Sequence, residues 1–176
     1  DKGMQFAKDN KHNFCADRTY DCLNAGILTQ IGDGFYMSND YENALDQVTI
    51  TLEDLENDGF GKQPWYWFLV AEKNNEIIGL SFYWIRYSTW KGKFLFLEDF
   101  VIKQEYRNKG VGSQLFEETI KICQKLNLNG MIWQVLDWNT PAINFYKKYN
   151  ADISKNWLNG KLTKKQINEI CVCKSI

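Results

Sequence analysis

The sequence contains few of the residues on which metal centres and catalytic triads depend. It has one histidine, His12, and five cysteines, whose spacing gives no disulfide framework. A zinc site of cysteine and histidine and a Ser-His-Asp triad therefore cannot be assembled from their usual parts. Free cysteines in odd number are typical of a reducing compartment, so we expect a cytoplasmic protein that holds no metal.

Long apolar runs and an excess of charge of one sign are absent as well. No run approaches the roughly 20 apolar residues that cross a bilayer, and the first residues lack the apolar stretch of a signal peptide. Lysine and arginine number 21 against 22 acids, a net charge of −1, so no global field would draw the chain to nucleic acid or to an anionic membrane. We expect neither as a partner.

Apolar and aromatic side chains, in contrast, are abundant. They make up 44% and 15% of the 176 residues, with seven tryptophans, which excludes disorder and suffices for one substantial core. Residues 1–13 are polar and without pattern. We therefore interpret 1–13 as a polar leader and 14–176 as a single domain.

Periodicity and turn residues predict the order helix, helix, three antiparallel strands, helix, strand, helix. Apolar residues fall at helical spacing over 21–31, and Thr51 with Asp54 forms a capping box for a short helix that Gly59 and Gly61 stop. Aromatic and branched runs at 66–72, 77–88 and 94–103 predict the strands. The next helix starts near Val111, and its Glu117 and Lys121 are placed to pair on the wet face.

The last third of the chain begins with a buried strand expected over 130–137. Proline follows Asn139-Thr140 and favours a helix start, because proline lacks only an N–H that would have no partner in the first helical turn. This helix should reach about Tyr149, with Asn150 as a left-handed cap. Thr163 and Gln166 form a capping box for a helix near 164–171. Together the elements predict an α+β (α/β) fold.

One short stretch, Arg107-Asn108-Lys109-Gly110-Val111-Gly112, runs directly into a helix. Backbone N–H groups at a helix N-terminus bind anionic phosphate, and glycines let the phosphate approach the main chain. A P-loop would need Gly-Lys-Ser/Thr, and a dinucleotide fingerprint would need a third glycine where this chain has Leu115, so neither motif fits. Taken alone, the hexad is equally compatible with a plain turn carrying solvated basic residues.

The surrounding sequence resembles a known family. Arg-x-x-Gly-x-Gly between a strand and a helix is similar to the acetyl-CoA pyrophosphate loop of the GNAT N-acetyltransferases. "FLEDFVIKQEYRNKGVGSQLF", "DWNTPAINFYKKYNA" and "DQVTITLEDLENDGFG" resemble the spermidine/spermine (diamine) and thialysine N-acetyltransferase branch, over residues 41–158. The resemblance implies a mixed, mostly antiparallel central sheet flanked by helices, an acetyl-CoA cleft between splayed central strands, and a homodimer.

The resemblance also implies acetyl-CoA as co-substrate and a set of residues that hold it. In the family the matching strand binds the pantetheine arm through its backbone and offers an N–H to the thioester oxygen, which is oxyanion stabilisation by the main chain. The cofactor-binding residues expected on this basis are Phe100, Val101, Ile102, Arg107, Asn108, Lys109, Gly110, Val111, Gly112, Ser113, Asn139, Ala142 and Tyr146.

Two residues are candidates for proton transfer. A free alkylammonium has a pKa near ~10, so a base must deprotonate it before it attacks a thioester. The resemblance assigns this role to Glu98. Without the resemblance, Glu98 would be one of two acids at a strand end. Because adjacent strand residues point to opposite faces, we expect only one of Glu98 and Asp99 to enter the site. It assigns the proton donor for the CoA thiolate to Tyr146, which helical spacing alone would place in the core.

Acids and aromatic residues are expected to bind the amine: Tyr41, Glu42, Trp90, Glu98, Asp99, Trp133 and Lys155. Ser88 and Lys155 stand where the polyamine enzymes place acids, which weakens attraction for a long polycation. A short diamine or a lysine-like amine such as thialysine fits this balance better. Cys123 lies on the apolar face of its helix with no histidine partner, so it is expected in the core.

Other functions remain open at this point. A protein or peptide N-acetyltransferase would keep the phosphate loop but need an open peptide groove. A CoA-binding sensor without catalysis would also keep the loop but need no amine site. A module that stacks nucleic-acid bases on its tryptophans should carry a basic stripe, which this chain lacks. The sequence favours acetyl transfer to a small amine.

Overall fold

The computed structural model describes residues 4–8, 50–156 and 160–172. The chain divides into two compact units, residues 1–134 and 135–176. The helix predicted over 21–31 and two candidate substrate residues, Tyr41 and Glu42, lie outside the described residues.

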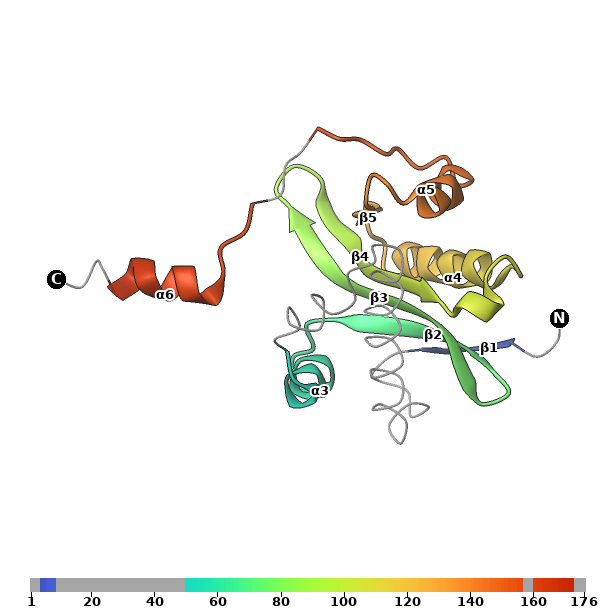
Figure 1. Ribbon diagram of the computed structural model, residues 1–176, viewed down its shortest axis with the longest axis horizontal. Helices are drawn as coiled ribbons and strands as arrows, with labels where there is room; N and C mark the ends of the chain where they lie inside the picture. The colour runs from blue at the N-terminus through green and yellow to red at the C-terminus, as the bar shows by residue number, and fades with distance from the viewer. Residues whose placement is uncertain (1–3, 9–49, 157–159, 173–176) are drawn as a thin grey trace. The chain divides into compact units, whose positions relative to one another are not determined.

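The first unit is built on a sheet with the strand order β1-β2-β3-β4-β5 (Figure 1). The strands are Met4–Lys8, Trp67–Lys73, Glu76–Ser88, Gly92–Ile102 and Met131–Trp133. The first four pair antiparallel in sequence order, while β5 pairs parallel with β4. The predicted meander is confirmed, and β1 lies within the stretch that the sequence indicated as a polar leader.

Turn residues set the two hairpins of the meander. Asn74 and Asn75 join β2 to β3 with φ of 53° and 65°, a left-handed pair that matches the twist of adjacent strands. Between β3 and β4, the Ser88 hydroxyl accepts hydrogen bonds from the backbone N–H groups of Trp90 (3.3 Å) and Lys91 (3.2 Å). Both turns are local in origin, which is why the sequence predicts them.

Helix α3, Leu52–Phe60, covers one face of the sheet, hereafter the α3 face (Figure 1). Its predicted capping box is confirmed: the Asp54 N–H donates to the Thr51 hydroxyl (3.1 Å), and the Thr51 N–H donates to the Asp54 carboxylate (2.9 Å). Leu55 packs in a buried cluster with side chains of the sheet and of the chain leading into it. The cluster comprises Leu55, Tyr66, Phe68, Val70 and Leu80, with Phe82 and Trp84 packed against it.

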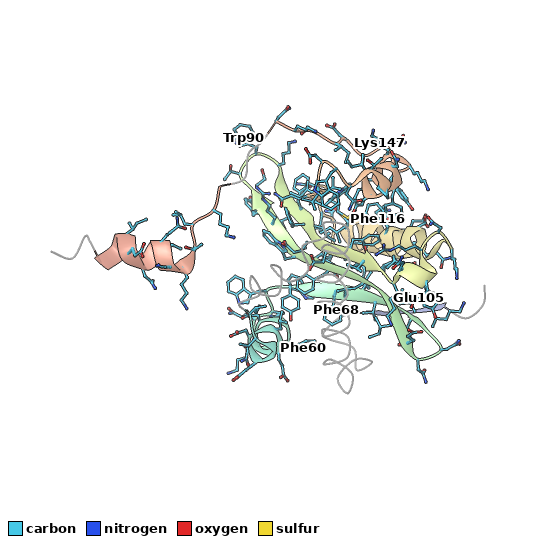
Figure 2. All side chains as sticks on the ribbon, in the orientation of Figure 1. Phe60, Phe68, Trp90, Glu105, Phe116 and Lys147 are labelled. Carbon is cyan, nitrogen blue, oxygen red and sulfur yellow. The ribbon has the colours of Figure 1, made fainter. Side chains whose placement is uncertain are left out.

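Helix α4, Val111–Lys125, covers the opposite face, hereafter the α4 face. Phe116 makes edge contacts with the rings of Phe100 and Trp133, and Figure 2 shows it across the sheet from Phe68. Cys123 is buried here, as predicted. A hydroxyl pair, Ser81 with Thr119 at 2.8 Å, joins the sheet to the helix. Apolar packing and one satisfied polar contact therefore fix α4 on the sheet.

The exposed side of α4 carries an ion pair between Lys121 and Glu118, next to the predicted partner Glu117. The Lys121 ammonium lies 2.7 Å from the Glu118 carboxylate, three residues back, and its hydrogen bond to Glu118 and then the nearby charges of Glu118 and Glu117 raise the pKa of Lys121. Spacings of three and four residues both bring side chains together on a helix, so the sequence alone does not choose between them.

Strand β5 is shorter than the predicted strand over 130–137. It spans Met131–Trp133 and pairs only with Leu95, Phe96 and Leu97, whereas β4 continues to Ile102. Strands β4 and β5 therefore share a ladder only near the start of β4, and this arrangement determines where the candidate site lies.

The second unit contains α5, Thr140–Lys147, and α6, Lys164–Val172. The Ala142 N–H donates to the Asn139 side chain (3.2 Å), and Asn150 has φ of 55°, so the predicted start and left-handed cap are confirmed. The Thr163 hydroxyl accepts from the Gln166 N–H (3.3 Å), and the Gln166 side chain accepts from the Thr163 N–H (2.8 Å). This confirms the predicted capping box of α6.

Candidate active site

The glycine-bearing loop lies between the end of β4 and the start of α4. A short 3-10 turn, Gln104–Tyr106, leads into it, and Asn108 and Gly110 then adopt left-handed backbone conformations with φ of 58° and 83°. Gly110 is the N-cap of α4 and makes no side-chain capping bond. The N-terminus of α4, with its first backbone N–H groups, therefore lies at an exposed glycine. The positive end of the helix dipole favours an anion there.

Space as well as charge is available at Gly110. A Cβ atom built there would have, within 4 Å, only the Nε2 atom of the Gln114 side chain, at 4.0 Å. Glycine is therefore required by its backbone conformation and not by crowding. The loop leaves room for a group that approaches the main chain.

Arg107, a predicted cofactor residue, is tied to the sheet. Its Nε donates a hydrogen bond to the Ile102 carbonyl oxygen at the end of β4 (2.9 Å). This bond spans the 3-10 turn and fixes the loop relative to the last residue of β4. The sequence identified the residue but not this contact, which depends on how the turn folds back.

Three residues outside the motif form a second anchor for the loop. The Glu76 carboxylate accepts hydrogen bonds from the Lys103 ammonium (2.7 Å) and the Tyr106 hydroxyl (3.0 Å). The hydrogen bond from Lys103 and then that from Tyr106 lower the pKa of Glu76. The Lys109 ammonium lies 5.8 Å from the centre of the Tyr106 ring, so its charge stays beside the loop. No sequence signal singled out Glu76 or Tyr106, because they meet only through the pairing of the start of β3 with the end of β4.

Glu98, the predicted base, stands at a β-bulge. In the ladder between β3 and β4, Tyr83 pairs with Leu97 and Phe82 pairs with Asp99, so Glu98 is an extra residue opposite no residue of β3. Bulges of this kind re-aim side chains and are frequent next to active sites. The bulge lies where β4 passes the end of β5.

The bulge places both neighbouring acids on the α3 face. Phe82 and Trp84 pack against the apolar cluster on that face. Asp99 lies opposite Phe82, and the Trp84 indole N–H donates to a Glu98 carboxylate oxygen (3.0 Å). The expectation that strand alternation would direct the two acids to opposite faces is wrong, because the extra residue interrupts the alternation.

The two carboxyl groups have different surroundings. Glu98 is exposed, whereas Asp99 is half-buried. Burial, and then the nearby charge of Glu98, raise the pKa of Asp99 to about 7. The Asp99 carboxyl is therefore able to take up or release a proton near neutral pH.

The two tryptophans predicted to bind substrate lie apart from this acid pair. Trp90 is 89% exposed at the tip of the β3–β4 hairpin (Figure 2). Trp133 contacts Phe116 on the α4 face, with ring centres 5.7 Å apart. Of the described substrate residues in the first unit, the structure brings together only Glu98 and Asp99.

The second unit holds the remaining candidates. Tyr146 is buried in α5, its ring 5.3 Å from that of Phe145, and burial raises the pKa of its hydroxyl to about 12. It therefore keeps its proton at neutral pH. The Lys155 ammonium lies 3.6 Å from the Asp137 carboxylate, and both side chains are exposed. Asn139 and Ala142 form the N-terminal cap of α5.

Within ranges 4–8, 50–156 and 160–172, no three histidine, cysteine or acidic side chains gather in a way that could hold a metal ion. None of the helices in these ranges has the length and apolar character needed to span a membrane.

Comparison with known proteins identifies similar chains. The model of the Acetyltransferase (GNAT) family matches residues 35–151. A thialysine N-epsilon-acetyltransferase from Bos taurus is 38% identical over 120 residues, covering 64% of this chain and 71% of that protein. A spermidine/spermine N(1)-acetyltransferase-like protein from Homo sapiens is 35% identical over 117 residues, 62% of this chain and 17% of that protein.

Solved structures agree on the fold. An integron cassette protein from the mobile metagenome of V. cholerae superposes with a TM-score of 0.68 at 17% identity, covering 97% of this chain and 99% of its own. An aminoglycoside acetyltransferase from an uncultured soil metagenomic sample has a TM-score of 0.68 at 14% identity, covering 91% and 99%. Together with the family match over most of the chain, these similarities show that the protein is an N-acetyltransferase and belongs to the GNAT family.

Proposed function

We propose that this acetyltransferase moves an acetyl group directly from acetyl-CoA to the primary amine of a small diamine or a lysine-like substrate such as thialysine. The observation that carries the proposal is the pair Glu98 and Asp99, two acids brought to one face where β4 passes the end of β5. Two adjacent carboxyl groups attract an alkylammonium and supply a proton acceptor. The names of the relatives from Bos taurus and Homo sapiens support the same class of substrate.

The phosphates of CoA are proposed to bind at the loop of residues 107–113. The backbone N–H groups before and at the start of α4 would donate to the pyrophosphate, and Lys109 would add a positive charge. Arg107 would hold the loop through Ile102 as well as contribute charge. The backbone of Phe100, Val101 and Ile102 would bind the pantetheine arm and polarise the thioester, and Asn139 and Ala142 would contact the cofactor.

Tyr146 is proposed to protonate the thiolate that leaves. A phenol whose pKa is raised to about 12 keeps its proton until a strong base forms beside it. The thiolate becomes such a base only as the thioester carbon–sulfur bond breaks, so the tyrosine acts in the transition state.

A homodimer is part of the proposal. Leu162, Ile167 and Ile170 are 59%, 47% and 47% exposed on and just before α6. Apolar side chains exposed together are frequently part of an interface. Light scattering at micromolar concentration should give twice the chain mass of 20.7 kDa, and a mass of one chain would contradict this part of the proposal. The cytoplasmic location stays a prediction.

The function is tested with a panel of acceptors. Free-thiol release from acetyl-CoA is measured with thialysine, short diamines, spermine and a histone-like peptide. We expect release with thialysine or a diamine at a kcat/KM well above that for the peptide. Release with the peptide alone would favour a protein acetyltransferase, and CoA binding without thiol release in any reaction would favour a sensor.

A further inference from the structure

The bulge in β4 gives two neighbouring acids different environments on one face. Glu98 is exposed and accepts a hydrogen bond from the Trp84 indole, so its position is fixed while its charge faces water. Asp99 is half-buried opposite Phe82. Burial disfavours the charged form of a carboxyl group, so the two acids differ in how strongly they are driven toward the neutral form.

We propose that Asp99, rather than Glu98, accepts the proton that the substrate ammonium loses, and that Glu98 holds the charge of that ammonium. This division of roles rests on the proposed acetyl transfer to a small amine. It assigns the proton acceptor to the half-buried carboxyl group and the attractive charge to the exposed one.

Aromatic side chains of β3 and of the chain that leads into β2 lie on the face that Asp99 shares. The Phe82 ring stacks on Tyr66, with ring centres 4.3 Å apart and planes at 29°. Phe82 also packs against the buried cluster that includes Leu55 and Phe68. An ionised carboxylate on this side of β4 loses water without gaining an opposite charge from these rings.

Several charged and titratable groups lie on the described elements of this face. Glu98 is the charged neighbour that raises the pKa of Asp99. Arg86 of β3 lies over the Phe96 ring at 5.9 Å. Tyr66 has a pKa raised to about 12 by burial and then by Asp58 of α3, so it stays neutral. The other acids of α3, Glu53, Asp54 and Glu56, are exposed.

The titration of Asp99 suits a general base. Burial and then the charge of Glu98 raise its pKa to about 7. Below that pH Asp99 holds a proton and cannot accept another; above it Asp99 is an ionised base. A base with a pKa near the working pH combines a sufficient ionised fraction with basicity, which makes proton transfer efficient.

The ammonium gives one proton to the Asp99 carboxylate and becomes an amine, whose lone pair forms a bond to the thioester carbon. The carbon–sulfur bond breaks, and the sulfur takes a proton from Tyr146, which regains one from the nitrogen. The products are the acetamide and CoA thiol, and Asp99 releases its proton to water before the next turnover.

Activity as a function of pH separates Asp99 from Glu98. With thialysine as acceptor, wild-type kcat/KM should fall below an apparent pKa near 7. Asp99→Asn should lose on the order of 10²-fold or more in kcat and lose this acid limb. Glu98→Gln should raise the KM for the amine, retain more kcat than Asp99→Asn, and move the limb to lower pH, because removing a neighbouring negative charge favours ionised Asp99. The opposite pattern, with the limb kept in Asp99→Asn and lost in Glu98→Gln, would overturn the proposal.

A titration without substrate gives an independent result. Carbon-13 NMR of labelled aspartate carboxyl groups in the intact protein should show one resonance that titrates near pH 7, disappears in Asp99→Asn and shifts to lower pH in Glu98→Gln. If every aspartate titrates near its ordinary value of ~3.9, Asp99 is not the acceptor whichever amine is used. Failure of wild type to acetylate any amine in the panel would instead refute the proposed function.

Discussion

Replacing Gly110 by aspartate tests the phosphate loop, with asparagine as a matched control. Both side chains have the same size, and both residue types tolerate the left-handed conformation at φ of 83° better than most. The space beside Gly110 admits either, since only Gln114 lies near. The two variants therefore differ in one negative charge placed where the pyrophosphate is expected.

The size of the effect follows from the distance and the exposure of the loop. At about 5 Å and an effective dielectric constant of ~20, two unit charges repel by roughly 3 kcal/mol. Gly110 is exposed, so screening reduces this to about 1–2 kcal/mol. Calorimetry should therefore give a Kd for CoA about 5–30-fold weaker for Gly110→Asp than for Gly110→Asn.

Protein stability separates loss of binding from loss of fold. A negative charge at the N-terminus of α4 favours the helix dipole, so Gly110→Asp should unfold at a Tm no lower than that of Gly110→Asn. The difference in Kd should also shrink as salt is raised. Equal affinity of the two folded variants for CoA at low salt would show that no phosphate lies at this helix end.

Three further substitutions test the remaining parts of the site. Tyr146→Phe should lose on the order of 10²-fold in kcat with CoA affinity retained, because the hydroxyl acts as the thioester breaks; a change confined to KM would make Tyr146 a packing or binding residue. Arg107→Lys keeps the charge but removes the guanidinium Nε that donates to the Ile102 carbonyl. CoA should therefore bind about fivefold more weakly, which corresponds to the loss of about one hydrogen bond. Unchanged affinity would show that only the charge of residue 107 matters. Lys155→Glu replaces the ion pair of Lys155 and Asp137 with two neighbouring acids, so kcat/KM for spermine relative to thialysine should rise several-fold. The control variant Lys161→Glu should leave this ratio unchanged. No rise in Lys155→Glu would mean that other groups govern selectivity.

Local signals in the sequence were sufficient for much of the fold. The capping boxes at Thr51 and Thr163 and the left-handed Asn150 depend on residues within a few positions of one another, and all three are present. The three-strand meander follows from aromatic and branched runs between polar turns. Such features are predictable because the energy that favours them is local.

The bulge at Glu98 was not predictable in this way. It depends on the register between β3 and β4, which is set by packing on both faces of the sheet and not by any residue pattern within β4. One extra residue shifted Asp99 onto the same face as Glu98. The sequence therefore identified the two acids but could not assign their separate environments.

The length of β5 and the anchors of the loop show the same limit. Apolar residues continue past Trp133, but only Met131–Trp133 finds a partner on β4, since a strand requires a neighbour as well as a suitable sequence. Glu76 and Tyr106 lie far apart in the chain and meet through a hairpin. Contacts that arise from tertiary structure have no signature in a single sequence.

The most direct measurement of the central claim is the stoichiometry of the reaction. Acetyl-CoA and thialysine are incubated with the protein. The CoA thiol is measured with a colorimetric thiol reagent, and the acetylated amine is measured by mass spectrometry. One thiol should appear per N-acetylated product, and Gly110→Asp should lower both rates together at acetyl-CoA concentrations below its KM. Thiol release without acetylated thialysine or diamine, or equal rates for Gly110→Asp and Gly110→Asn, would contradict acetyl transfer to a small amine from CoA bound at this loop.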